Sequence, residues 1–256
     1  MKKTLLAGSS VFVLFLVWLI AAALLQNEII LPGPQAVFQA FWEIVTSLRN
    51  LEAIGSTILR LLLAMGIALV TGLFLGVIGG LKPAISQILK PIVTILRTVP
   101  VISIVIIVLI IFGFRDTPYV ITFLMIFPLL YQAVSEGIKN IDPELIDVYK
   151  LEDDHFFSGL WHCYLPLIGD QIKTALLQSA GLGIKVMIMA EYLSQTQNSI
   201  GNMLYLEKVN LRFDYVFAWT GILIIAAVIM EAMIERYSQK KLPGSLIFAM
   251  KRQERD

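Results

Sequence analysis

Residues 56–80 read STILRLLLAMGIALVTGLFLGVIGG, and Arg60 is their only charged residue. A helix needs about 20 mostly apolar residues to cross the hydrocarbon core of a bilayer. Gly72 and Gly76 stand four residues apart, and small residues at this spacing let two helix backbones approach closely. The stretch therefore predicts a membrane-spanning helix that packs tightly against a neighbouring helix.

Five other stretches are long and apolar enough to be membrane spans. Of the 256 residues, 57% are hydrophobic and 15% are charged, whereas a soluble domain carries about 25% charged residues. We therefore expect an all-α polytopic membrane protein with six transmembrane helices. The other five predicted spans are residues 5–26, 88–113, 118–137, 174–193 and 213–234.

The first apolar stretch follows Met-Lys-Lys and can be a signal peptide or a retained helix. We expect it to be retained, because the apolar part of a signal peptide is only about 7–15 residues long. Six spans place both termini on one side of the membrane, and loops rich in Lys and Arg stay in the cytoplasm. We therefore expect both termini in the cytoplasm. Thirteen Lys and Arg residues lie on that side (Lys2, Lys3, Lys82, Lys90, Lys139, Lys150, Lys173, Arg236, Lys240, Lys241, Lys251, Arg252 and Arg255), against five on the other (Arg49, Arg60, Arg115, Lys208 and Arg212).

Residues 139–170, KNIDPELIDVYKLEDDHFFSGLWHCYLPLIGD, form the longest polar interval, which falls on the cytoplasmic side between the fourth and fifth spans. Asp142 suits a helix N-cap and Pro143 suits the first helical position. We expect a helix over 142–158 with one apolar and one acidic face. Periodicity alone leaves open whether the apolar face packs on the chain's own bundle or binds a partner. The apolar face would consist of Leu145, Val148, Tyr149 and Leu151.

This interval resembles the cytoplasmic EAA loop of binding-protein-dependent ABC importer permeases. In that family a short helix ends in a Leu-Gly-Ala-like turn, and Leu-Pro follows further along. Leu151 holds the first position, and Leu165-Pro166 hold the second. The resemblance to the nitrate/sulfonate/taurine branch extends over nearly the whole chain. The segments that carry it are LPGP (31–34), LKPIVTILRTVPVISIVIIVLIIFGF (89–114), FPLLYQAVSEGIKNID (127–142) and AEYLSQTQNSIGNML (190–204).

Three positions depart from the family pattern. Glu152 replaces the glycine of the loop, so either the turn is remade or the helix runs on, because Glu tolerates positive φ poorly. The arginine that usually follows Leu-Pro is represented by Lys173 or is absent. In SIGN (199–202), only the second glycine of the family's Gly-x-Gly is kept, at Gly201.

The resemblance implies a type I ABC importer permease fold in the inner membrane of a bacterium: a single permease domain over 1–256, with the coupling loop at 139–172. Such a permease pairs with a second permease, identical or similar, and with two cytoplasmic ATP-binding subunits that hold ATP and Mg. It receives its solute from an extracytoplasmic binding protein and has no cofactor or catalytic site of its own. Separately, the net charge of +1 in this sequence implies no nucleic-acid partner. The residues expected to couple to the ATPase are Leu145, Val148, Tyr149, Leu151, Glu152, Asp153, Asp154, Leu165 and Pro166.

Charged residues inside predicted spans are candidates for the solute path, because burying a charge in lipid costs at least about 2.5 kcal/mol. Lys185 either contacts an anionic solute or pairs with Glu136 or Glu191. Arg97 either caps carbonyls freed by Pro100 or extends to the lipid headgroups. The candidate path residues are Lys185, Glu191, Arg97 and Pro100.

Other functions fit the sequence less well. His155, His162 and Cys163 match no structural zinc spacing. The alternative function is a polytopic membrane enzyme whose cytosolic acidic site includes EDDH (152–155), but consecutive carboxylates on a helix point in different directions. A secondary transporter predicts inverted repeats, which the sequence does not display.

Overall fold

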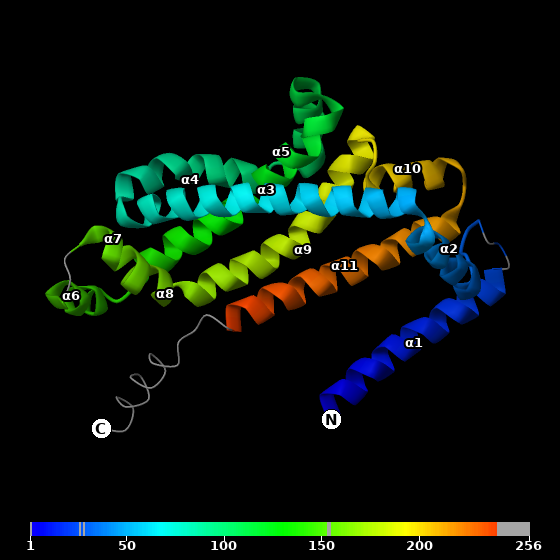
Figure 1. The fold of residues 1–256 in the computed structure, drawn as a ribbon, viewed down its shortest axis with the longest axis horizontal. Coiled ribbons are helices and arrows are strands. Elements are labelled where there is room, and N and C mark those ends of the chain that lie inside the picture. Colours follow the sequence, from blue (N-terminus) through cyan, green and yellow to red (C-terminus); the bar gives the residue numbers. More distant parts are fainter. Residues whose placement is uncertain (1, 26, 28, 153–154, 240–256) are drawn as a thin grey trace. The chain divides into compact units, whose positions relative to one another are not determined.

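The computed structural model describes residues 2–25, 27, 29–152 and 155–239, and every regular element in these ranges is a helix (Figure 1). The all-α fold class is therefore confirmed. The elements are α1 (Lys2–Leu25), α2 (Pro34–Thr46), α3 (Leu48–Leu81), α4 (Pro83–Thr98), α5 (Val101–Lys139), α6 (Pro143–Glu152), α7 (Phe156–Gly159), the π-helix η1 (Leu160–Tyr164), α8 (Leu165–Leu167), α9 (Gly169–Ser194), α10 (Ile200–Val209) and α11 (Phe213–Gln239).

Four helices among the described residues are long and apolar enough to cross a membrane. Each of the four, α3, α5, α9 and α11, contains a predicted span. In α1, Phe12–Leu25 form a shorter apolar helix. The total of six spans therefore stays a prediction. The four candidate spans are Leu48–Leu81, Val101–Lys139, Gly169–Ser194 and Phe213–Arg236.

The single helix predicted over 88–113 is wrong. Two helices cover this range: α4 ends at Thr98, and α5 begins at Val101. Pro100 lacks an N–H and disfavours helical backbone at the residue before it, which agrees with the extended backbone of Val99 (φ −69°, ψ 134°). The third and fourth predicted spans instead share α5, which is interrupted at Gly113 (φ 75°, ψ 179°). Glycine, having no Cβ, adopts this positive φ without strain.

The chain forms two compact units. The first comprises Met1–Leu62, Ile102–Ile121 and Val186–Ala226. Its core includes Ala40 and Ile44 from the amphipathic helix α2, together with Trp219 from α11, and these three side chains are at most 2% exposed.

The helix α1 contacts the rest of unit 1 through Trp18. Its indole N–H donates a hydrogen bond to the Pro32 carbonyl (3.2 Å), and its ring stacks on Phe217 of α11 with 6.2 Å between centroids. These contacts give α1 a docking place, and its retention in the mature protein stays a prediction.

The second unit comprises Leu63–Val101, Thr122–Lys185 and Ala227–Asp256. In it, α3 and α5 approach closely along the glycines noted in the sequence. A Cβ on Gly72 would lie 2.8 Å from the Cβ of Leu130, and one on Gly76 would lie 2.6 Å from the Cβ of Val134. Real Cβ atoms do not come this close, so the small-residue spacing serves helix packing, as predicted.

Candidate functional site

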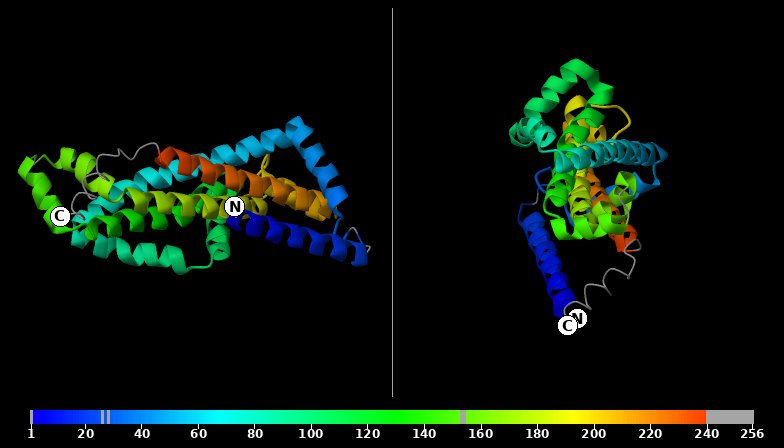
Figure 2. Two further views of the ribbon diagram at one scale, coloured as in Figure 1. Left: turned by 90° about the horizontal axis from the view of Figure 1, so that it is seen from below. Right: turned by 90° about the vertical axis from the view of Figure 1, so that its left-hand side faces the viewer.

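The polar interval between α5 and α9 folds into short helices (Figures 1 and 2). Its first helix, α6, begins where the sequence predicts. The Asp142 carboxylate accepts a hydrogen bond from the Glu144 N–H (3.0 Å), and Pro143 occupies the first helical position. The helix ends at Glu152, and a separate helix, α7, begins at Phe156, so the single helix predicted over 142–158 is wrong. Glu152 itself has helical backbone, so no turn with positive φ occurs at this residue. Glutamate is compatible with that conformation, because helical φ is negative.

Apolar side chains of this interval remain exposed. Leu145 is 51% exposed and Trp161 is 66% exposed. Leu165 is half-buried and Pro166 is exposed. Of the other predicted coupling residues, Asp153 and Asp154 lie outside the described residues, as do the side chains of Val148, Tyr149, Leu151 and Glu152. The coupling surface as a whole therefore stays a prediction.

The C-terminal part of the interval is anchored in unit 2. Ile168 is fully buried and packs in one cluster with Val134 and Ile138 of α5, and Leu165 packs against this cluster. A Cβ on Gly137 would lie 3.1 Å from the Cβ of Ile168, so this contact is also close. The loop is thus joined by tight apolar packing to the end of α5 and the start of α9.

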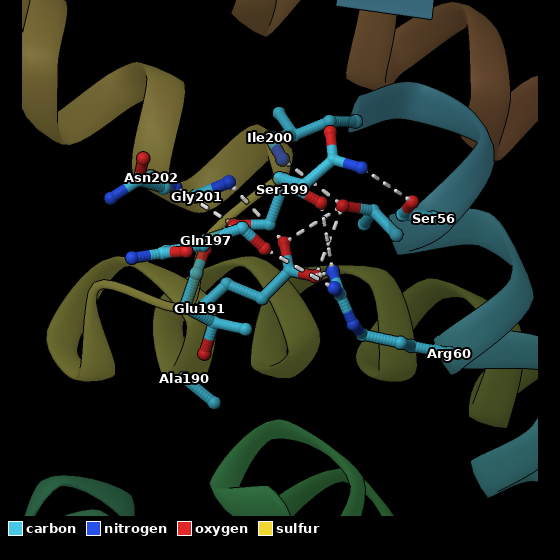
Figure 3. A network of polar contacts seen from close by, with 12 residues as sticks. Ser56, Arg60, Ala190, Glu191, Gln197, Ser199, Ile200, Gly201 and Asn202 are labelled. Carbon is cyan, nitrogen blue, oxygen red and sulfur yellow. Dashed lines mark hydrogen bonds and ion pairs between the residues drawn. The ribbon is translucent and has the colours of Figure 1, made fainter. Parts of the chain in front are cut away.

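Glu191 is the centre of a buried polar network in unit 1 (Figure 3). The Thr57 hydroxyl lies within hydrogen-bond distance of both carboxylate oxygens (3.0 and 2.9 Å). Arg60 Nη1 donates to Oε1 (3.0 Å), and the Gly201 N–H donates to Oε2 (3.2 Å). We call Thr57, Arg60, Glu191 and Gly201 the Glu191 clasp. It connects α3, α9 and α10, and it surrounds with donors a carboxylate that is 0% exposed.

The clasp also holds the loop between α9 and α10. Arg60 donates to the carbonyls of Asn198 (3.2 Å) and Gln197 (3.3 Å). Ser199, which stands where the family has its first glycine, is the N-cap of α10 and accepts a hydrogen bond from the Asn202 N–H (3.0 Å). Its backbone is extended (φ −147°), so no glycine is needed there.

Gly201, by contrast, has no room for a side chain. A Cβ at this position would lie 2.5 Å from the backbone nitrogen of Tyr192 and 2.5 Å from the Cβ of Glu191. The retained glycine thus allows α10 to lie directly on the end of α9, where its N–H reaches the Glu191 carboxylate.

The remaining predicted path residues have different surroundings. Lys185 is exposed in α9, and among the described residues it makes no ion pair with Glu136. Glu191 pairs with Arg60 instead of Lys185. Arg97 donates a hydrogen bond to the side-chain oxygen of Gln132 on α5.

The face of α9 that carries Lys185 also carries two polar residues that the sequence did not predict as site residues. Gln171 and Gln178 are exposed and precede Lys185 by fourteen and seven residues. Seven residues make about two helical turns, so the three side chains share one face of α9. We call them the α9 polar stripe. The seven-residue spacing was the signal in the sequence that would have revealed it.

Comparison with known proteins identifies the family of this chain. Residues 68–242 match the family model described as the binding-protein-dependent transport system inner membrane component. The chain belongs to this family. It is thus a membrane permease component of an ABC transport system, which confirms the resemblance seen in the sequence.

The permease is similar in sequence to transport permeases of bacteria. It is 25% identical over 248 residues to the taurine transport system permease protein TauC of Escherichia coli, an alignment that covers 94% of this chain and 90% of that one. It is 23% identical over 219 residues to the putative aliphatic sulfonates transport permease protein SsuC of Bacillus subtilis, covering 84% and 78% of the two chains. Family and helices together support a multi-pass inner membrane protein.

The described residues also bear on a metal centre. Among its described residues, no three His, Cys, Asp or Glu side chains gather in a way that could hold a metal ion. Burial raises the pKa of the Cys163 thiol, which disfavours the thiolate form that binds metals.

Proposed function

We propose that this chain is the translocation subunit of an ATP-driven importer. It pairs with a second permease, identical or similar, and forms the path for a small solute delivered by an extracytoplasmic binding protein. Two cytoplasmic ATP-binding subunits, which carry ATP and Mg, bind the segment 142–158. The observation that carries the proposal is the segment of short helices between α5 and α9, whose Leu145 and Trp161 side chains are exposed although its base is tightly packed.

The packed base supports a mechanical role for this segment. An ATP-binding subunit that displaces α6 also displaces Leu165 and Ile168, which pack with Val134 and Ile138. Protein interiors are close-packed and transmit such displacements. Closure of the ATP-binding subunits therefore moves the ends of α5 and α9, both of which are candidate membrane spans.

The proposed orientation follows from the basic residues. The side of the membrane that holds the segment 139–172 carries thirteen Lys and Arg residues, and the other side carries five. Both termini then lie in the cytoplasm, on the same side as the ATP-binding subunits.

The proposed solute is a small sulfonate. Two relatives are named as taurine and sulfonate permeases. The α9 polar stripe supports the proposal, because it places two amides and one ammonium group along an exposed face of a candidate span. We assign the Glu191 carboxylate a structural role rather than solute contact, because it is buried and already bound by three donors, the Thr57 hydroxyl, Arg60 and the Gly201 N–H.

Reconstitution tests the proposed function. The chain is co-purified with its ATP-binding subunits and placed in proteoliposomes. The binding protein and a radiolabelled sulfonate are added outside the vesicles. We expect uptake that requires both ATP and the binding protein. A matched preparation with the ATP-binding subunits alone should accumulate nothing. Uptake that persists without ATP would contradict the proposal.

Lys185→Ala should raise the KM for sulfonate uptake by about tenfold, because a hydrogen bond to a charged group contributes on the order of 1.5–3 kcal/mol. Lys185→Arg should keep most of the affinity, since it keeps the positive charge. Uptake kinetics measured in the same proteoliposomes, with the amount of assembled complex checked by gel filtration, decide the result. Identical kinetics for the alanine variant and the unmodified chain would rule out solute contact at Lys185.

A further inference from the structure

A cavity of about 530 Å³, lined by both polar and apolar side chains, lies in unit 2 and shares no residue with the Glu191 clasp or the α9 polar stripe. Its walls come from the end of α3, from α4 and from the last turns of α5. This volume falls in the range of about 300–1,000 Å³ that is usual for small-molecule sites. Its lining includes two lysines, Lys90 and Lys139, and one carboxylate, Glu136, so the side chains that line it carry a net charge of +1.

Tyr131 lines this cavity and is only 4% exposed. Its hydroxyl has no hydrogen-bond partner within the described part of the chain. A Cβ on Gly79 would lie 2.7 Å from that hydroxyl, so the glycine makes the room that the hydroxyl occupies. Leaving a buried hydroxyl without a hydrogen-bond partner costs free energy, so the cavity favours a ligand that accepts a hydrogen bond from the Tyr131 hydroxyl.

The other polar groups of the cavity also have donors to spare. Lys139 Nζ donates to the Ser86 hydroxyl oxygen (2.5 Å), which leaves the Ser86 hydroxyl proton available. The side-chain oxygen of Gln132 accepts from Arg97, which leaves the Gln132 amide group as a donor. The Lys90 ammonium adds three donors and accepts none. The lining therefore offers several donors and an excess of positive charge.

We propose that this cavity binds a tetrahedral oxyanion group, either the phosphate of a lipid headgroup or a free phosphate or sulfonate. Lys90 supplies the charge, and Tyr131, Gln132 and Ser86 supply neutral donors. An oxyanion presents three or more acceptors and a negative charge, which match this set of donors. The proposal does not depend on ATP coupling or on the α9 polar stripe, because it concerns binding to other residues of the permease chain alone.

The test uses the full chain purified in a non-ionic detergent and a phosphate-free buffer. Three probes are added separately: inorganic phosphate, methanesulfonate and phosphatidylglycerol. Calorimetry measures binding of the two soluble anions, and native mass spectrometry measures retention of the lipid. Lys90→Gln and Tyr131→Phe should each weaken binding by at least about fivefold, because each removes one hydrogen bond to a charged group. Lys82→Gln is the matched control, since Lys82 is an exposed lysine that does not line the cavity.

Each outcome decides the proposal. Binding of a soluble anion that is sensitive to both cavity variants assigns the site to a free oxyanion. Retention of phosphatidylglycerol alone, with the same sensitivity, assigns it to a lipid headgroup. Absence of binding for all three probes, or equal binding by Tyr131→Phe and Lys82→Gln, overturns the proposal. Tyr131→Phe removes only an unpartnered oxygen, so its melting temperature without ligand should match that of the unmodified chain.

Discussion

Leu151→Asp should abolish capture of the ATP-binding subunits while the permease still inserts into the membrane. Leu151 occupies the leucine position of the family's coupling loop, and the α6 backbone is helical at this residue. A helix that docks in a groove depends on a few apolar anchors, and a carboxylate placed in such a groove loses its hydration without gaining a partner. We expect the affinity to fall at least about 100-fold, as for the loss of a strong interface anchor.

Affinity capture through a tag on the permease measures this effect. Leu145→Asp should act in the same direction, because Leu145 belongs to the same predicted apolar face and is 51% exposed. Leu211→Asp is the matched control, since Leu211 is 58% exposed but lies between α10 and α11. If Leu151→Asp captures the ATP-binding subunits as well as Leu211→Asp does, α6 is not their docking helix.

Arg60→Ala should destabilise the permease by about 3–5 kcal/mol, which is the usual result of breaking a buried ion pair from one side. The substitution leaves the Glu191 carboxylate buried with a negative charge and without its cation. It also removes the two hydrogen bonds to the carbonyls of Gln197 and Asn198. For a chain of this size the melting temperature should fall on the order of 10 °C.

Thermal unfolding in detergent, followed by circular dichroism, measures this loss. Arg115→Ala provides the control, because Arg115 is an exposed arginine. In the double variant Arg60→Ala/Glu191→Gln the buried charge is also removed, so part of the stability should return. Equal melting temperatures for Arg60→Ala and Arg115→Ala would show that the clasp does not stabilise the fold.

The two departures from the family pattern at Glu152 and Ser199 have local explanations. In each case the family uses glycine, and in each case this chain has a backbone conformation that does not require it. Glu152 is the last residue of α6 and has helical backbone, and Ser199 is an extended N-cap whose hydroxyl accepts from the Asn202 N–H. Gly201 is retained because the constraint there is the space beside Glu191 and Tyr192, which no conformational change of one residue relieves.

The amino-acid sequence by itself determined the helical membrane class, the position of the polar loop and the start of α6 at Asp142. These features are local: an apolar run long enough for a bilayer, or a cap and a proline at adjacent positions, acts over one helix. Local patterns were less reliable at 88–113, where Pro100 ends one helix instead of kinking a continuous one, and where nothing in the apolar run indicated the positive φ of Gly113.

Only the tertiary structure decided which residues pair across the chain. Glu191 is bound by Thr57 and Arg60, which precede it by 134 and 131 residues, and neither periodicity nor spacing links such positions. The donor-rich cavity likewise combines residues from α4 and α5 that no single stretch brings together. Hydrophobicity and capping act through neighbours in the sequence, whereas the partners of a buried charge are set by how the helices pack.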